Sequence, residues 1–539
     1  MLIALGLLIL IILLLWYKYV SLSNIFKETS EKQNNSIDAL KKEVLSLNEQ
    51  KQILYNQINT YNTEISNLNG NITELTRKLE FYQNIEEDST NLNNSSANNI
   101  SIKDSSFENL ILDKEQSFAL DLAENTNQNL FITGKAGTGK SFLLNYFKEH
   151  TLKKHITLAP TGISALNVNG VTLHSAFGYH NLVNLNVDSI SYDKILLKSE
   201  KKMLLKNVST IIIDEISMVR ADTFDKIDKI LKELNQNNLP FGGKQVLIFG
   251  DLFQLPPIVK KDEHNYLYDK YGGPYFFNSS AYKNSNFKFL ELSINHRQDS
   301  DSSYFELLNR IREGLITKTD IDILNTRIVK DESIYDRFTS LLPTKAEVEN
   351  VNKQHINQLD SKLYTYAAVI TYDKNPDNTR NVESIFPIMN ILNLKKGALV
   401  MMTSNDPEQR WVNGTLGIVN KLFNDSIFVS INKRTYEIHP VEFTEQEALY
   451  LNDSIKYEDS FKVRQYPIIP AYAITIHKSQ GQTFNNIVCD IDRCFTNGQA
   501  YVALSRCTSL NGLHLKQKIT GSSIHVDKNI LDFYKSQIS

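Results

Sequence analysis

One eight-residue stretch, GKAGTGKS from Gly134 to Ser141, restricts the possible folds of this chain more than any other feature. It matches the pattern G-x-x-x-x-G-K-[ST], with the apolar run LFIT before it and the helically periodic run SFLLNYF after it. A strand, a glycine-rich turn and a helix in this order place backbone amides around phosphate groups at the positive end of the helix. The stretch therefore predicts a nucleoside triphosphate site in an α/β domain.

The same pattern gives roles to single positions. Lys140 is predicted to reach the β- and γ-phosphates, and the hydroxyl of Ser141 is predicted to bind Mg²⁺. Because the whole loop surrounds the phosphates, all of its residues are candidate ATP contacts. They are Gly134, Lys135, Ala136, Gly137, Thr138, Gly139, Lys140 and Ser141.

Two further apolar runs end in polar side chains, as buried strands of a parallel sheet do at their carboxyl ends. STIIIDEISMV leads into Asp214, which is expected to hold Mg²⁺, and Glu215, which is expected to polarise the attacking water. KQVLIFGDLFQLPP leads into Asp251 and Gln254. The neutral amide of Gln254 can sense a γ-phosphate without neutralising it. Together the three strand ends predict an ATP-hydrolysing site.

Composition limits the partners that this chain can have. With 539 residues, of which 41% are hydrophobic, it is long enough for about three globular domains. A formal net charge of −3 and a pI near 6.4 argue against wrapping duplex DNA by bulk charge, so a nucleic acid would need a local groove. Cys489, Cys494 and Cys507 lack the spacing of a zinc site or a disulfide framework.

The first twenty residues have a membrane-like character. Seventeen uncharged residues precede Lys18, which is at the lower limit for a helix that crosses a bilayer. Positive charges at Lys18 and Lys27 follow the run and none precedes it, so we expect residues 1–20 to be a single-pass anchor, with the rest of the chain cytoplasmic. A cleaved signal peptide is the alternative, but the basic start and the small-residue cleavage site are missing.

Residues 24–83 carry a heptad pattern with mostly Ile at one core position and mostly Leu at the other, over about seven heptads. The pattern predicts a coiled coil that forms a parallel homodimer. A single amphipathic helix packed on another domain is the alternative. Residues 84–106 are rich in Asn, Ser and Asp and are expected to form a disordered linker.

Six motifs follow one another in order along the rest of the chain. They are GKAGTGKS, APTGISALNVNGVTLHSAF, DEISMV, PFGGKQVLIFGDLFQLPP, AYAITIHKSQGQTF and AYVALSRCTS. This series resembles the Pif/RecD-like branch of superfamily-one DNA helicases, on the Pif side, from about residue 107 to about residue 515. The resemblance implies an α/β fold of two RecA-like P-loop domains, at 107–290 and 291–530, with a small β-barrel inserted at about 390–460.

The resemblance also implies roles around the nucleotide. Gln116 matches the glutamine that reads adenine in this family. Arg297 and Arg506 match two arginine fingers, which would close on the γ-phosphate from the second domain. With Lys140, Asp214, Glu215 and Gln254, these two arginines complete the expected catalytic set.

Five other positions are implied as nucleic-acid contacts. Four match positions that touch the backbone of the single strand, and the fifth, an aromatic residue, is a candidate for base stacking that would look the same if it belonged to the core. They are Thr161, His174, Thr475 and His477 for the backbone, and Phe177 for stacking.

Members of this family track 5′ to 3′ along single-stranded DNA and unwind tailed or forked duplexes. The resemblance therefore implies an ATP-dependent DNA helicase that uses ATP and Mg²⁺, here tethered to a membrane bilayer and dimerised by its coiled coil. Two alternatives stay open. One is an RNA-directed helicase, since backbone and stacking contacts need not read the 2′-hydroxyl. The other is a membrane-anchored P-loop ATPase scaffold without motor activity.

Overall fold

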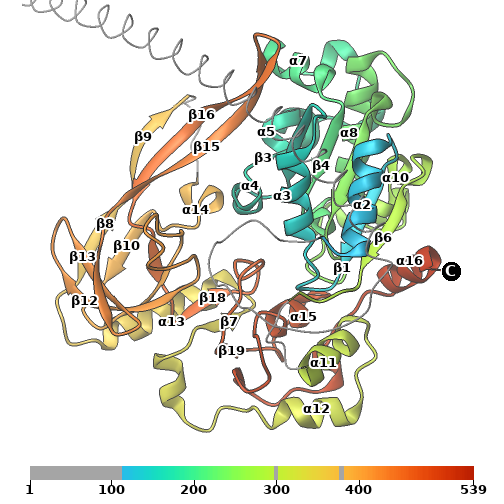
Figure 1. The fold of residues 1–539 in the computed structure, drawn as a ribbon. Helices are drawn as coiled ribbons and strands as arrows, with labels where there is room; N and C mark the ends of the chain where they lie inside the picture. The colour runs from blue at the N-terminus through green and yellow to red at the C-terminus, as the bar shows by residue number, and fades with distance from the viewer. Residues whose placement is uncertain (1–111, 297–301, 375–380, 539) are drawn as a thin grey trace, which may run out of the picture. The chain divides into compact units, whose positions relative to one another are not determined.

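The computed structural model describes residues 112–296, 302–374 and 381–538, and Asn109–Ser539 form one compact unit (Figure 1). The predicted membrane anchor, coiled coil and linker lie outside the described residues. Within the described ranges, no helix is both long enough and apolar enough to cross a membrane.

Six parallel strands form the sheet that carries the glycine-rich loop, which we call the first sheet. Their order is β3-β2-β4-β5-β1-β6, and β4 and β5 are buried at every residue because both faces of the sheet are covered. The predicted domain boundary at residue 290 falls inside the last of these strands. The strands are β1 (Leu130–Gly134), β2 (His155–Ala159), β3 (Val171–Thr172), β4 (Thr210–Ile213), β5 (Gln245–Phe249) and β6 (Lys288–Leu292).

Successive side chains of the central strands point to opposite faces of the first sheet. Ile212 belongs to a cluster with apolar residues of α2 (Lys114–Asn125) and α3 (Lys140–His150). Its neighbour Ile211 packs instead in the large cluster that contains the apolar face of α8 (Ala221–Asn235). The apolar runs noted in the sequence are thus strands that contribute side chains to the core on both faces of the sheet. The polar residues that follow them lie at the carboxyl edge of the sheet.

Four parallel strands form a second sheet, in the order β18-β7-β19-β20. Two separate parallel sheets, each with helices packed against it, agree with the two RecA-like domains expected from the sequence. The strands are β7 (Ser340–Leu342), β18 (Ala473–Thr475), β19 (Ile487–Cys489) and β20 (Leu513–Leu515), and the helices that follow the chain through this part are α11 (Ser302–Arg312), α12 (Lys318–Asn325), α13 (Lys345–Gln358) and α15 (Gln499–Leu504).

The C-terminal helix α16 (Lys528–Ile538) leaves the second sheet and packs beside the first (Figure 1). Phe533 stacks on Phe277 with ring centroids 4.2 Å apart, and Tyr534 meets Phe289 of β6 edge-on at 5.5 Å. The last helix of the chain therefore joins the two sheets.

Antiparallel strands fill the segment between the second sheet's first two strands in chain order. Burial alternates along β13, and the two-residue turn after it has positive φ at Asn432 and Lys433, the geometry of a tight hairpin. These strands start earlier and end later than the 390–460 expected. They are β8 (Tyr364–Ala367), β9 (Val369–Asp373), β10 (Ile391–Leu394), β11 (Leu399–Met402), β12 (Leu416–Leu422), β13 (Ile427–Ile431), β14 (Arg434–Ile438), β15 (Val441–Leu451), β16 (Ser454–Gln465) and β17 (Ile468–Pro470).

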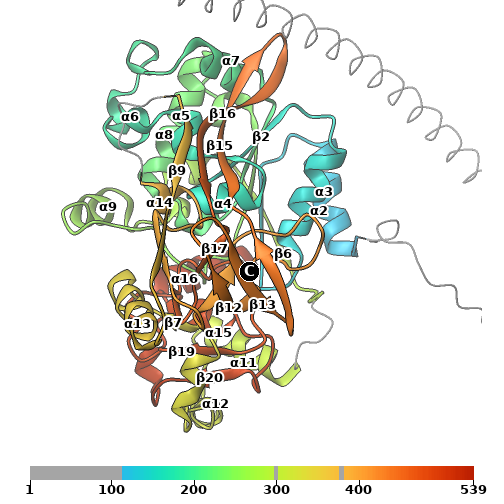
Figure 2. The ribbon, with the colours of Figure 1, turned by 90° about the vertical axis from the view of Figure 1, so that its left-hand side faces the viewer.

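The longest hairpin, β15 with β16, extends from this insertion to α7 (Ser199–Asn207), and Figure 2 shows β9, β16 and β15 side by side. Near the tip, Glu447 is buried and forms an ion pair with Lys201 of α7 at 2.9 Å, and a second ion pair with Lys374. The hairpin is thereby fastened to the part of the chain that surrounds the first sheet.

Candidate active site

The glycine-rich loop connects β1 to α3 at the carboxyl edge of the first sheet. Lys140 begins α3, and its Nζ donates hydrogen bonds to the carbonyl oxygens of Gly134 and Lys135 at 2.7 and 3.0 Å. Gly139 has φ of 80°, and a Cβ there would collide with the amide of Gln116. The loop is therefore curled around its own lysine at a helix N-terminus, which fits a bound triphosphate.

Gln116, the expected adenine reader, lies against this loop. It is buried, it forms a capping box with Asp113 at the start of α2, and its Nε2 is 3.3 Å from Nε2 of His296. The His296 backbone N–H also donates to the Gly137 carbonyl at 3.0 Å. His296 was not singled out from the sequence, although it stands in the INHRQ stretch beside Arg297. Arg297 itself lies outside the described residues.

Asp214 and Glu215 follow β4 at the same edge, as predicted. Glu215 has φ of 51°, a left-handed conformation that costs energy in a residue with a side chain. Burial raises the pKa of both carboxyl groups, the charge of Asp214 raises that of Glu215 further, and the Lys140 ammonium opposes both shifts. The acids and the loop lysine are thus close enough to influence one another.

The two predicted magnesium ligands offer oxygen atoms of the kind that this ion prefers. Ser141 contributes an exposed hydroxyl in the first turn of α3, and Asp214 a half-buried carboxylate. Proteins commonly bind Mg²⁺ through one or two such groups together with substrate phosphates and water. Within the described residues no cluster of three His, Cys, Asp or Glu side chains forms a separate metal site.

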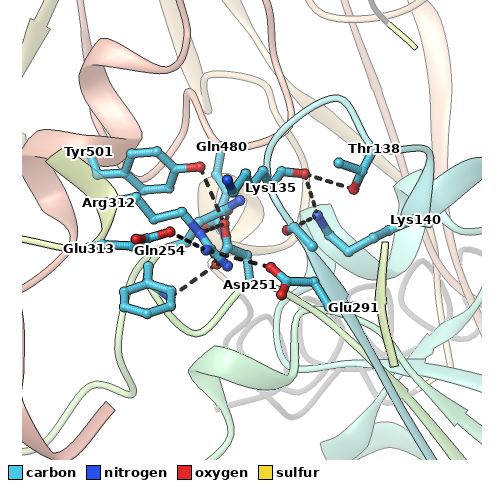
Figure 3. A network of polar contacts seen from close by, with 12 residues as sticks. Lys135, Thr138, Lys140, Asp251, Gln254, Glu291, Arg312, Glu313, Gln480 and Tyr501 are labelled. Atoms are coloured by element: carbon cyan, nitrogen blue, oxygen red, sulfur yellow. Dashed lines mark hydrogen bonds and ion pairs between the residues drawn. The ribbon is translucent and has the colours of Figure 1, made fainter. Parts of the chain in front are cut away.

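A glutamine from the second sheet reaches the acids of the first. Nε2 of Gln480, in the loop after β18, donates to Oε2 of Glu215 at 2.8 Å. It also donates to Oε1 of Gln254 at 3.2 Å (Figure 3). The predicted water-polarising group and the predicted phosphate sensor are therefore joined through one side chain. The sequence reasoning missed Gln480, although it lies inside the quoted stretch TIHKSQGQTF.

Arg506 lies just after α15 and is buried. Its guanidinium donates to the carbonyl oxygens of Val502 at 2.9 Å and Gln482 at 3.2 Å, and to the hydroxyl of Ser505 at 2.9 Å. Its charge nevertheless lowers the pKa of Glu215. The structure thus places Arg506 close to the site, with its role as an arginine finger still a prediction.

Two of the expected nucleic-acid contacts occupy matching places on the two sheets. Thr161 follows β2 and Thr475 ends β18, both at carboxyl edges. Each threonine hydroxyl accepts a hydrogen bond from the backbone N–H three residues later, at Ser164 and Lys478, with distances of 3.1 Å. The two threonines thus cap equivalent turns near a strand end.

The remaining three candidates differ in exposure. His174 and His477 are half-buried, and burial lowers the pKa of both imidazoles. The shift favours the neutral ring, in which one nitrogen donates a hydrogen bond and the other accepts one. Phe177 is 0% exposed and packs in the core cluster of the first sheet. The stacking role considered for Phe177 is wrong for this arrangement, because no face of its ring is available to a base.

Comparison with known proteins decides the family. A family model described as PIF1-like helicase matches residues 111–322. The ATP-dependent DNA helicase Pif1 of Bdellovibrio bacteriovorus is 34% identical over 426 residues, which cover 79% of this chain and 92% of that protein. The chain belongs to the Pif1-like helicase family. The ATP-dependent DNA helicase Pif1 of Campylobacter jejuni is 33% identical over 431 residues, which cover 76% of this chain and 94% of that protein.

Solved structures of the family show the same fold. Bacteroides sp Pif1 in complex with ADP-AlF4 superposes with a TM-score of 0.71 at 36% identity, over 79% of this chain and 97% of that one. Bacteroides Pif1 bound to ssDNA gives a TM-score of 0.57 at 36% identity over the same shares. The present chain is therefore an enzyme of the Pif1 type, an ATP-dependent DNA helicase with an ATP-type nucleotide site, and the resemblance seen in its motifs is confirmed at the level of the family.

Proposed function

We propose that this chain hydrolyses ATP with Mg²⁺ in order to move 5′ to 3′ along single-stranded DNA, and that it separates tailed or forked duplexes as it moves. The observation that supports the proposal most directly is the bridge from Gln480 to Glu215 and Gln254. Because this bridge joins the two sheets across the site of hydrolysis, a change at the nucleotide alters the contact between them, which is what a motor requires.

The residues divide the chemistry between them. The loop amides and Lys140 bind the phosphates, while Ser141 and Asp214 hold Mg²⁺, which when bound neutralises phosphate charge. Glu215 orients the attacking water and accepts its proton, and a raised pKa suits a group that must take up a proton. Arg506, with Arg297, compensates the charge that develops on the transferred phosphoryl group.

The path of the DNA is proposed along the carboxyl edges of both sheets. Thr161 with His174 on the first, and Thr475 with His477 on the second, would hold successive phosphates, since neutral imidazoles and capped turns offer hydrogen bonds without reading the bases. Relatives support a DNA partner, though not these particular residues: Bacteroides Pif1 has been solved bound to ssDNA, and another structure is described as DNA unwinding at forked dsDNA by two coordinating Pif1 helicases.

Polarity is tested with a duplex that carries a single-stranded tail on one side. Residues 109–539 form a compact unit and serve as the enzyme, with Lys140→Ala as the inactive control. We expect unwinding of the 5′-tailed duplex and at least about tenfold slower unwinding of the 3′-tailed one. Preference for the 3′ tail would reverse the proposed direction, and equal activity on RNA tails would favour the RNA-directed alternative.

For the N-terminal part we propose an anchor at 1–20, a parallel dimer through 24–83 and a flexible linker at 84–106, which would keep the helicase at the cytoplasmic face of a bilayer. This proposal rests on the uncharged run and the heptads alone. Light scattering of residues 24–90 is expected to give the mass of a dimer. A monomer at micromolar concentration would contradict the proposed dimer.

A further inference from the structure

A fully buried arginine lies next to the nucleotide site and has no role in the proposed mechanism. Arg312 ends α11, its side chain is 0% exposed, and its Nε and Nη2 donate to Oδ1 of Asp251 at 3.2 and 3.1 Å (Figure 3). Asp251 follows β5 of the first sheet and is also fully buried. A cation from α11 is thus paired with a carboxylate at the strand end that leads to Gln254.

The surroundings of Arg312 fix its guanidinium in one place. Phe253 covers the plane at 4.2 Å and Tyr534 of α16 lies at 5.3 Å, both within the range of cation–π attraction. Its Nη1 has no hydrogen-bond partner among the described residues, and the carboxylates of Glu291 and Glu313 are 3.9 Å away. Burial lowers the pKa of Lys140, and the charges of Asp251 and Arg312 act on it as well, Asp251 raising it and Arg312 lowering it. The ion pair is therefore close enough to the nucleotide site for its charges to influence Lys140.

Asp251 shapes the turn that presents Gln254. Its Oδ1 accepts a hydrogen bond from the Phe253 backbone N–H at 3.2 Å, and its carbonyl oxygen accepts one from the Gln254 N–H at 3.0 Å. A carboxylate held by Arg312 thus sets the conformation of the turn. Any displacement of Arg312 would move the phosphate-sensing amide.

Helix α15 of the second sheet rests on the same turn. The Tyr501 hydroxyl donates to Oδ2 of Asp251 at 3.4 Å. Burial raises the pKa of this hydroxyl, and the nearby backbone N–H of Ala136 in the glycine-rich loop opposes the rise. Gly498, which begins α15, lies so close to the turn that a Cβ would collide with the carbonyl oxygens of Phe253 and Gln254. Tyr501 therefore touches the loop, the turn and the helix that leads to Arg506.

We propose that Arg312, Asp251 and Tyr501 are positioning residues that carry the DNA-dependent change of the second sheet to the nucleotide site. The inference rests on the proposed function, because it supposes that DNA stimulates hydrolysis. A buried ion pair contributes little net stability by comparison with a well-packed apolar pair, so stability alone does not account for this one. Its three members come from α11, from the turn after β5 and from α15. Polar contacts through Asp251 therefore join these three parts of the structure.

The test compares Tyr501→Phe and Arg312→Lys with a matched control, Tyr275→Phe. Tyr275 is likewise buried and its hydroxyl donates to a carboxylate, that of Asp527 at 2.5 Å, which precedes α16 and does not belong to the nucleotide edge. The measured quantity is the ratio of the ATP hydrolysis rate with saturating poly(dT) to the rate without it. This ratio does not change when a variant merely lowers the fraction of folded enzyme.

We expect the ratio to fall about tenfold in Tyr501→Phe, the effect of losing one hydrogen bond to a charged group on an equilibrium. Arg312→Lys keeps the charge but loses the two-point contact and the stacking, so a similar fall is expected. Tyr275→Phe should stay within about twofold of the unchanged protein. A normal ratio in Tyr501→Phe, with DNA stimulating the unchanged protein, would overturn the linkage alone. No stimulation of the unchanged protein would overturn the proposed function, and the linkage with it.

Discussion

At the scale of single residues, the site depends on how a few charges share one buried space. Glu215 stands between Asp214, which raises its pKa, and Lys140, which lowers it, and it accepts a hydrogen bond from Gln480. If Glu215 takes the proton from the attacking water, its replacement by an amide of the same shape should stop proton transfer while leaving the binding groups in place.

We therefore expect Glu215→Gln to lower kcat for ATP hydrolysis on the order of 100-fold or more. Nucleotide affinity should change by less than about threefold, because the glycine-rich loop and Lys140 are untouched. Steady-state hydrolysis and the binding of a fluorescent ATP analogue measure the two quantities separately. Normal hydrolysis by this variant would assign the base to another group.

The sequence predicted that Lys140, Asp214, Glu215 and Gln254 lie at one edge of a sheet, because each follows an apolar run in a local pattern, and the structure places them there. It missed Gln480, since nothing local shows that a loop after β18 meets the end of β4. Arg312 left a signal that was not used: it lies four and eight residues after the buried Leu308 and Tyr304, on the apolar face of its helix. A cationic residue on the apolar face of a helix indicates a buried carboxylate partner. For Phe177, in contrast, the motif gave no signal, because an aromatic residue at that position can lie in the core or at the surface.

At the scale of elements, the hairpin β15–β16 is the least expected piece. The resemblance implied a small β-barrel here, and the alternating burial along β13 agrees with it. The extra strands β8 and β9 were not predicted, because they are short and take their pairing from β10 and β16, distant in sequence. The contact of the hairpin tip with α7 is likewise long-range, and local patterns carry no information about it.

The ion pairs at this tip make the element testable. Removing the Glu447 carboxylate would leave Lys201 and Lys374 without their shared partner, and we expect Glu447→Ala to weaken local stability by about 1–3 kcal/mol. Faster hydrogen exchange in residues 441–465 would report it. Glu458→Ala is the control, since Glu458 is 46% exposed and 3.5 Å from Lys374, and such surface pairs contribute little. Equal exchange in the two variants would contradict a specific role for the tip.

At the scale of the whole molecule, the strand-end motifs predicted one parallel sheet, and the resemblance to the Pif/RecD-like helicases implied the second. The contacts that join the sheets did not follow from it. They depend on the return of α16 to β6, on the approach of Gly498 to the turn at Gln254, and on the pairing of Arg312 with Asp251. Each of these unites residues more than sixty positions apart, and only tertiary packing selects such partners.

We propose that the nucleotide site drives movement on single-stranded DNA. The most direct measurement is ATP hydrolysis by residues 109–539 with and without a single-stranded DNA oligonucleotide, beside Lys140→Ala. We predict stimulation of about tenfold or more in the unchanged protein and no hydrolysis above background in the variant, because Lys140 holds the phosphates. Hydrolysis that ignores both DNA and RNA would contradict the account and favour an ATPase scaffold without motor activity.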